Sequence, residues 1–184
     1  MASSALIVID MLNPYDHADA DELAAHVEDI VAPLRRLLDR ARESDVELVY
    51  VNDNYGDFAA SRDQLVERAL CGRRPELVEP IVPGDGCDLL QKVRHSAFYS
   101  TSLEYLLQQR GVSQVILTGQ VTEQCVLYTA LDAYVRHYEV CVPADAVAPI
   151  DPALGDAALK MMRRNMRAEI VVADDLLQRM PART

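Results

Sequence analysis

The sequence predicts an α/β protein, a three-layer α/β/α sandwich in which helices cover both faces of a mainly parallel sheet. Six short apolar runs, rich in valine and isoleucine, alternate with longer segments whose apolar residues recur at helical intervals. Several of these runs are apolar at consecutive positions, which is typical of parallel strands buried on both faces. Right-handed crossovers between such strands place the helices in two layers. The chain has 184 residues, so we predict a single domain over residues 1–184.

The strand candidates each centre on a short apolar run that ends at a polar residue or a glycine. They are residues 5–9, 47–51, 88–91, 114–117, 139–142 and 169–172. Runs of this length match ordinary strands and are far too short to cross a bilayer. Together they predict a six-stranded sheet.

The helix candidates lie between these strands. The predicted helices are residues 21–43, 102–110, 122–137 and 151 to about 166. Pro33 lies inside the first of them and predicts a kink or a break. Thr101 and Glu104 fit a capping box before the second helix, and Gly111 fits its end. Asp151 followed by proline fits the start of the last helix.

The charge of the chain excludes some partners. Eighteen basic residues stand against 29 acidic ones, giving a formal net charge of −11. Binding to DNA or RNA needs a cationic surface, and an anionic membrane repels such a chain, so neither partner is expected. No basic stretch followed by a long apolar run marks a secretory signal. The four cysteines lack CxxC spacing and indicate free thiols, so we expect a cytoplasmic protein.

Reactive side chains follow four of the predicted strands. Asp10 follows the first strand, Asp53 the second and Lys92 the third, and Cys125 comes shortly after the fourth. Ligands of open parallel sheets bind at the carboxyl ends of the strands. We therefore expect a carboxylate, an ammonium and a thiol along one edge of the sheet.

Cys125 falls in the first turn of its predicted helix. The free N–H groups and the dipole of a helix start favour an anion, so we expect this position to lower the thiol pKa. A neighbouring carboxylate can take the thiol proton, and backbone N–H groups of the same turn can hold an oxyanion. Position alone also allows plainer roles. Cys125 can be a small core residue, Asp10 a cap, and Lys92 a solvated strand end.

Motifs for nucleotide binding, zinc proteases and the common serine hydrolases are absent: the sequence contains no GxxxxGK[ST], GxGxxG, HExxH or GxSxG. The histidines, at positions 17, 26, 95 and 137, show no spacing typical of metal ligands. A catalytic Cys–His pair requires His95 beside Cys125, and we favour the carboxylate of Asp10 because it is better placed. No metal and no organic cofactor is predicted.

Four segments, in the same order, resemble the isochorismatase-like cysteine hydrolases. They are ALIVIDMLNPY around Asp10, LLQKVRHSAFYST around Lys92, LTGQVTEQCVLYTALDAY around Cys125, and EVCVPADAVA, and they span residues 5 to about 148. The resemblance implies a Rossmann-like fold of the isochorismatase type. It also implies Asp10 as general base, Cys125 as nucleophile and Lys92 as the cation that stabilises both.

The resemblance further implies a non-proline cis peptide bond between Gln120 and Val121. That bond would direct the backbone N–H groups of Val121 and Cys125 to one point, as an oxyanion hole. Oligomers are common among such hydrolases, so a homo-oligomer, dimer or tetramer, is expected. Tyr15, Gln120 and Phe98 neighbour the catalytic segments and are candidate substrate-binding residues, although Tyr15 and Phe98 fit the core equally well. Tyr55 is either a cover for the site or a surface-loop residue.

One departure from the pattern bears on the substrate. Nicotinamidases of this family bind a metal through an Asp and nearby histidines after the second strand, whereas here Asp53 is present and no histidine occurs between His26 and His95. Nicotinamide is therefore less favoured. The complete Asp–Lys–Cys set favours hydrolysis of a small-molecule C–N bond, amide or carbamoyl, through a thioester. The alternatives are vinyl-ether hydrolysis of the isochorismatase type using Asp10, and a non-catalytic scaffold that keeps the fold.

Overall fold

The structure is a computed structural model, and it describes residues 3–180. The strands are β1 (Ser3–Ile9), β2 (Glu47–Asp53), β3 (Asp88–Lys92), β4 (Val112–Gln120), β5 (Glu139–Pro143), β6 (Val147–Ala148) and β7 (Glu169–Val171). The α-helices are α1 (Ala20–Arg42), α2 (Arg62–Leu70), α3 (Pro75–Val78), α4 (Leu103–Gln109), α5 (Leu127–Val135), α6 (Pro152–Asn165) and α7 (Ala173–Arg179). Three short helical turns are η1 (Glu79–Ile81), η2 (Thr122–Val126) and η3 (Ala144–Ala146).

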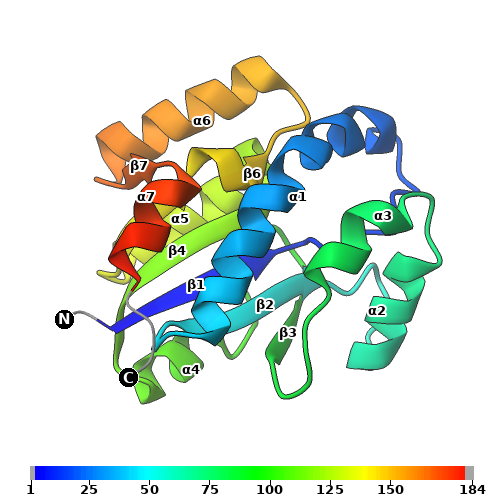
Figure 1. Cartoon of the computed structure of the whole chain (residues 1–184), viewed down its shortest axis with the longest axis horizontal. Helices are drawn as coiled ribbons and strands as arrows, with labels where there is room; N and C mark the ends of the chain where they lie inside the picture. Colours follow the sequence, from blue (N-terminus) through cyan, green and yellow to red (C-terminus); the bar gives the residue numbers. More distant parts are fainter. Residues whose placement is uncertain (1–2, 181–184) are drawn as a thin grey trace.

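The sheet is parallel in every pairing between described strands, with the order β3-β2-β1-β4-β5-β7 (Figure 1). This confirms the predicted parallel α/β architecture, and all six predicted strands are present. The two-residue strand β6 was not predicted, because it is too short to leave a pattern; it pairs with the end of β4. β1 lies at the centre between β2 and β4, so the residue that follows it lies at the middle of the carboxyl edge.

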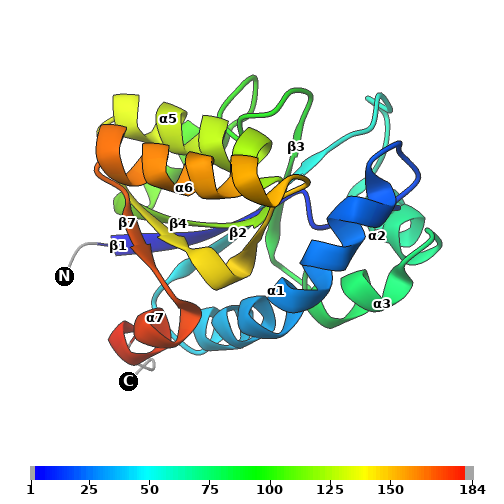
Figure 2. The same ribbon diagram turned by 90° about the horizontal axis from the view of Figure 1, so that it is seen from above.

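Helices cover both faces of the sheet (Figure 2). In β1, Leu6 and Val8 join a core cluster with α1, α3 and α7, whereas Ala5, Ile7 and Ile9 join a second cluster with α4, α5 and α6. Successive side chains of a strand point to opposite faces, and here both faces are buried. The consecutive apolar residues of the sequence are explained by these two cores.

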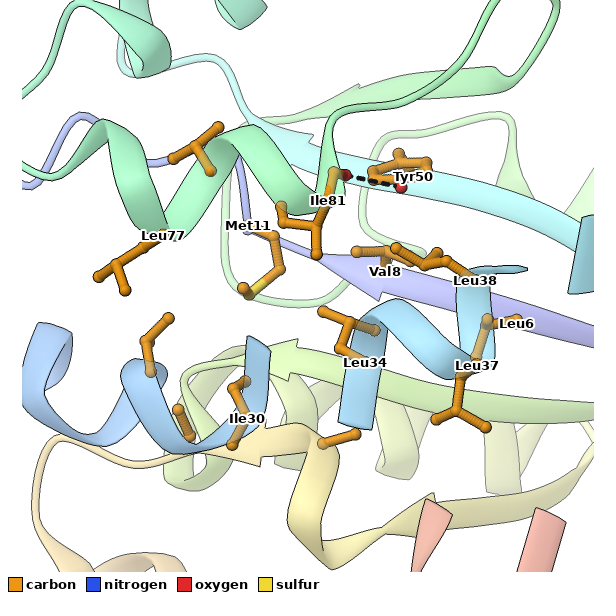
Figure 3. Close-up of a cluster of buried hydrophobic side chains, with 14 of the residues drawn as sticks. Leu6, Val8, Met11, Ile30, Leu34, Leu37, Leu38, Tyr50, Leu77 and Ile81 are labelled. Carbon is orange, nitrogen blue, oxygen red and sulfur yellow. Dashed lines mark hydrogen bonds between the residues drawn. The ribbon is translucent and has the colours of Figure 1, made fainter. Parts of the chain in front are cut away.

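The α1 face of the sheet is packed by leucines of α1. Leu34, Leu37 and Leu38 contact the sheet residues, and the Tyr50 hydroxyl donates a 2.8 Å hydrogen bond to the carbonyl of Ile81 (Figure 3). Full burial of a leucine side chain contributes about 2 kcal/mol. Of the kink or break predicted at Pro33, the break is wrong, because α1 continues through the proline. Buried residues on both sides of the proline, Ile30 before it and Leu34 after it, keep both halves of the helix on the same sheet.

The start of α6 agrees with the prediction from the sequence, whereas the start of α4 does not. The Asp151 side chain accepts hydrogen bonds from the N–H groups of Ala153 and Leu154, as a cap of α6 should. The capping box at Thr101 is absent, because Glu104 instead pairs with Arg136. Helices α2, α3 and α7 were not predicted. Within residues 3–180, none of the helices combines the length and the apolar character that a membrane span requires.

Candidate active site

Asp10 lies at the carboxyl end of β1, where its backbone conformation and its hydrogen bonds fix its position. Its φ angle is +55°, a left-handed conformation that aspartate tolerates better than most residues. Its N–H donates to the carbonyl of Val51 at 3.0 Å, and its carbonyl accepts from the Gln120 side chain at 2.6 Å. The carboxylate accepts a 2.8 Å hydrogen bond from the N–H of Asp53. Strands β2 and β4 on either side therefore fix the direction of this side chain.

Lys92 ends β3, and its side chain is only 1% exposed. Its Nζ lies 2.8 Å from Asp10 Oδ2, 3.5 Å from Asp53 Oδ2 and 3.7 Å from Cys125 Sγ. Since β2 separates β3 from β1, the long lysine side chain must cross the end of β2 to reach Asp10. The ammonium thus links residues that follow three different strands.

Cys125 lies in η2, a wide helical turn in which the N–H of Val126 donates to the carbonyl of Val121, five residues back. The thiol is buried, its Sγ lies 3.7 Å from Lys92 Nζ, and the nearby Asp10 carboxylate raises its pKa. The peptide bond between Gln120 and Val121 is cis, which confirms the expectation from the resemblance. The backbone N–H of Val121 acts to lower the pKa of the Cys125 thiol. The nucleophile candidate therefore has a carboxylate, an ammonium and a backbone N–H around it.

A glycine makes this close packing possible. Gly119 has a φ of +102°, and a Cβ there would lie 2.1 Å from the carbonyl oxygen of Ile9, well inside contact distance. Gly119 pairs with Ile9 in the sheet, directly beside Asp10. The end of β4 can therefore approach the end of β1 only without a side chain at this position.

The charges at the site depend on one another. Burial raises the Asp10 pKa, while Lys92, Cys125 and the N–H of Asp53 act to lower it. Burial acts to lower the Lys92 pKa, but Asp10, Cys125 and Asp53 outweigh it, so that pKa is raised and the ammonium stays protonated. Burial and then Asp10 raise the Cys125 pKa well above its usual range. The predicted lowering of the thiol pKa is wrong, because burial beside a carboxylate outweighs the helix start.

Thr129 joins the turn that carries Cys125 to the loop that follows Lys92. Its hydroxyl donates to the Cys125 carbonyl at 2.6 Å and accepts from the Ala97 N–H at 2.9 Å. Thr129 is fully buried, so water does not compete for these bonds. One side chain therefore fixes the distance between the two reactive segments.

A pocket of about 360 Å³ opens onto this cluster. Asp10, Lys92, Val121 and Cys125 line it, and so does Gln120, one of the three predicted substrate-binding residues. The structure does not bring the other two to the pocket. The Tyr15 hydroxyl is buried against the Gln120 side chain at 3.4 Å, and Phe98 stacks on Tyr138 in the core. Tyr55 lines the pocket, and its hydroxyl donates to the carbonyl of Leu12 at 2.9 Å.

Comparison with known proteins identifies the family of this chain. The sequence profile described as the Isochorismatase domain matches residues 4–175. The chain belongs to the isochorismatase family. It is 33% identical to YaaI of Bacillus subtilis, described as an uncharacterized isochorismatase family protein, over 97% of this chain and 98% of YaaI.

Two further relatives of this isochorismatase-family chain have names that state an activity. One is the ureidoacrylate amidohydrolase RutB of Methylorubrum extorquens, 30% identical over 86% of this chain and 75% of RutB. The other is the crystal structure of N-carbamoylsarcosine amidase from Thermoplasma acidophilum, with a TM-score of 0.71 and 32% identity, covering 94% of this chain and 97% of that one. The family therefore includes amidohydrolases.

Several pocket residues of this isochorismatase-family protein were not among the site residues that the sequence favoured. The loop after β1 contributes Asn13, Asp16, His17 and Asp19, and the loop after β3 contributes Arg94 and His95. His95 lies with its Nδ1 3.9 Å from Cys125 Sγ, although the sequence favoured the carboxylate over this pair. The sequence indicated this Cys–His pair only as the less favoured alternative to Asp10, and the structure brings His95 close to the sulfur.

The residues present do not fit the metal site of the nicotinamidases in the family. Asp53, the one candidate ligand after β2, lies 3.5 Å from the Lys92 ammonium, and a cation so close opposes a metal ion. No group of three or more His, Cys, Asp or Glu side chains suited to a metal occurs within the described part of the chain. No step of the chemistry below involves a metal.

Proposed function

We propose that this protein is a cysteine hydrolase that cleaves the C–N bond of a small amide or carbamoyl compound through a thioester on Cys125. The single observation that carries the proposal is the convergence of three groups at the pocket floor. Lys92 Nζ lies 2.8 Å from the Asp10 carboxylate and 3.7 Å from the Cys125 sulfur, so one ammonium joins the carboxylate to the thiol. The names of RutB and N-carbamoylsarcosine amidase support C–N hydrolysis as the reaction class.

The first half of the reaction forms the thioester. Because the raised thiol pKa keeps Cys125 neutral at rest, Asp10 removes its proton as the sulfur attacks the carbonyl carbon. The Lys92 ammonium stabilises the negative charge that moves between carboxylate and sulfur. The N–H groups of Val121 and Cys125 hold the oxygen of the tetrahedral intermediate. The C–N bond then breaks and ammonia or an amine leaves.

The second half hydrolyses the thioester. Besides the proton taken from the thiol, turnover needs two proton transfers: one to the nitrogen as the C–N bond breaks in the first half, and one from the water that attacks the thioester in the second. Asp10 is able to carry both if it releases its proton to the nitrogen before the water attacks. The thiolate then recovers a proton from Asp10, and the acid is released.

A panel of small primary amides and carbamoyl compounds, screened for ammonia release, tests this function. We expect turnover of at least one compound by the native protein and loss of that turnover in Cys125→Ala and Asp10→Asn. Cys71→Ala is the matched control, since it removes an exposed thiol far from the pocket lining. Full turnover by Cys125→Ala would refute the thioester scheme.

One observation favours a second candidate, vinyl-ether hydrolysis of the isochorismatase type. The raised pKa of Asp10, caused by its burial, suits a carboxyl group that delivers a proton to carbon. In that reaction the thiol is secondary. Vinyl-ether hydrolysis predicts that Asp10→Asn abolishes activity while Cys125→Ala largely spares it. The same two variants therefore distinguish vinyl-ether hydrolysis from C–N hydrolysis. A scaffold without chemistry predicts no turnover by any of the proteins.

A further inference from the structure

The Cys125 sulfur has a second polar neighbour besides the Asp10–Lys92 pair. His95 Nδ1 lies 3.9 Å from Cys125 Sγ, slightly farther than the 3.7 Å that separates the sulfur from Lys92 Nζ. His95 lines the pocket and is exposed, whereas Asp10, Lys92 and Cys125 are buried. The imidazole therefore lies on the solvent side of the nucleophile.

The His95 ring is oriented by a neighbour from the helix that follows Cys125. The Tyr128 ring meets it edge to face, with centroids 5.3 Å apart. Aromatic pairs prefer this geometry, which favours one ring orientation over free rotation. The imidazole is thus held beside the sulfur by a residue of the same helical segment.

The Asp10 carboxylate is poorly available for further proton transfers. Its Oδ1 already accepts from the Asp53 N–H at 2.8 Å, and its Oδ2 lies 2.8 Å from the Lys92 ammonium. After it takes the thiol proton, it also has to reach a leaving group and a water that arrive from the pocket mouth. His95 lines the pocket and is exposed, and its imidazole is able both to donate and to accept a proton.

We propose that His95 is a catalytic residue that carries the two outer proton transfers; this inference rests on the proposed function. As imidazolium, His95 gives its proton to the nitrogen while the C–N bond breaks. The neutral imidazole then takes a proton from the water that attacks the thioester. As the C–S bond breaks, the thiolate recovers its proton from Asp10. All three groups return to their starting protonation, and one water is consumed.

The test uses p-nitrophenyl acetate, which acetylates a reactive thiol, with the full-length protein. Acetyl-Cys125 is formed, excess reagent is removed, and decay of the adduct is followed by intact mass. We expect His95→Asn to slow this decay by about 100-fold, because the base for water is lost. The rate of acetylation should change little, because nitrophenolate leaves without a proton. His137→Asn is the matched control, since His137 lies outside the pocket lining and has a φ of +66° that asparagine tolerates.

A second measurement compares 4-nitroacetanilide with the ester, since both carry the same acetyl group. The kcat/KM for the anilide should fall about 100-fold in His95→Asn relative to the ester, because an amine leaves only when protonated. An altered fold would slow acetylation by both compounds together. An unchanged decay of acetyl-Cys125 in His95→Asn would overturn the role of His95. Absence of acetylation at Cys125 in the native protein would instead overturn the proposed function itself.

Discussion

Lys92 places its ammonium 2.8 Å from the Asp10 carboxylate, and the two side chains are only 1% and 11% exposed. They come from the ends of β3 and β1, and β2 lies between them. A buried ion pair adds little net stability, but removal of one partner leaves a buried charge without compensation. This pair therefore makes stability and chemistry depend on the same contact.

Neutralising one member of the pair should destabilise the fold more than neutralising both. Asp10→Asn and Lys92→Met should each lower the free energy of unfolding by about 3–5 kcal/mol, measured by urea denaturation. The double variant should lose clearly less than the sum, because neither Asp10 nor Lys92 is left buried as a charge opposite a missing partner. Asp174→Asn is the control, since its ion pair with Arg36 is exposed and should contribute less than about 1 kcal/mol. Additive losses would contradict the coupling.

Activity should fall on acidification at a pH above the ordinary aspartate pKa of 3.8. Burial raises the Asp10 pKa, and the proposed reaction requires the ionised carboxylate. The stability linked to this group has the opposite sign. A raised folded-state pKa means that its contribution is fully present below pH 3.8 and is lost as the pH rises through the raised value.

Titration of Asp10 should therefore lower activity without unfolding the protein. The measurement is kcat/KM against pH, with circular dichroism at each point. On the alkaline side, the raised Cys125 and Lys92 pKa values predict no decline near pH 9.0, the ordinary value for a thiol. A decline centred there would show that the resting thiol ionises normally.

The raised thiol pKa also predicts slow alkylation of Cys125. Folded Cys125 should react with iodoacetamide more slowly than an unhindered thiol at pH 8–9, because the thiolate fraction is small. Exposed Cys71 in the same protein is the internal reference, and peptide mapping separates the two. Slow alkylation is thus compatible with an enzyme, and faster labelling of Cys125 than of Cys71 would contradict the burial effect.

Gly119→Ala should be strongly destabilising. The added Cβ would lie 2.1 Å from the Ile9 carbonyl at a φ of +102°, so β1 and β4 must separate beside Asp10. A loss of at least about 2 kcal/mol is expected, by thermal or urea unfolding. Gly84→Ala is the matched control, because a Cβ there meets nothing within 4 Å, and it should change little.

Thr129→Val should weaken both stability and activity. It keeps the shape but removes the hydroxyl, leaving the Ala97 N–H buried without its acceptor, at a cost of about 1–3 kcal/mol. Thr129→Ser retains both hydrogen bonds. Its turnover should therefore be close to that of the native protein, even where its free energy of unfolding is lowered by the lost packing. If Thr129→Ser and Thr129→Val behave alike, the hydroxyl does not position Cys125.

The sequence alone located Asp10, Lys92 and Cys125 on one edge of a parallel sheet. This worked because parallel strands bring their carboxyl ends to the same edge, so a residue directly after a strand has little freedom of place. The prediction that Phe98 and Tyr15 bind the substrate had no such basis, and the structure does not bring them to the pocket. Adjacency along a loop does not fix which way a side chain points, and Phe98 turns into the core against Tyr138.

Only the tertiary structure determined the properties that depend on burial and on the packing of loops, namely the direction of the Cys125 pKa shift and the position of His95. The sign of the Cys125 pKa shift follows from desolvation and the nearby Asp10, neither of which a helix position reveals. The place of His95 beside the sulfur follows from how the loop after β3 packs against η2 and α5. Hydrophobic periodicity specifies strands and helices, because burying them drives folding. The electrostatics of the pocket arise only after that folding removes the water.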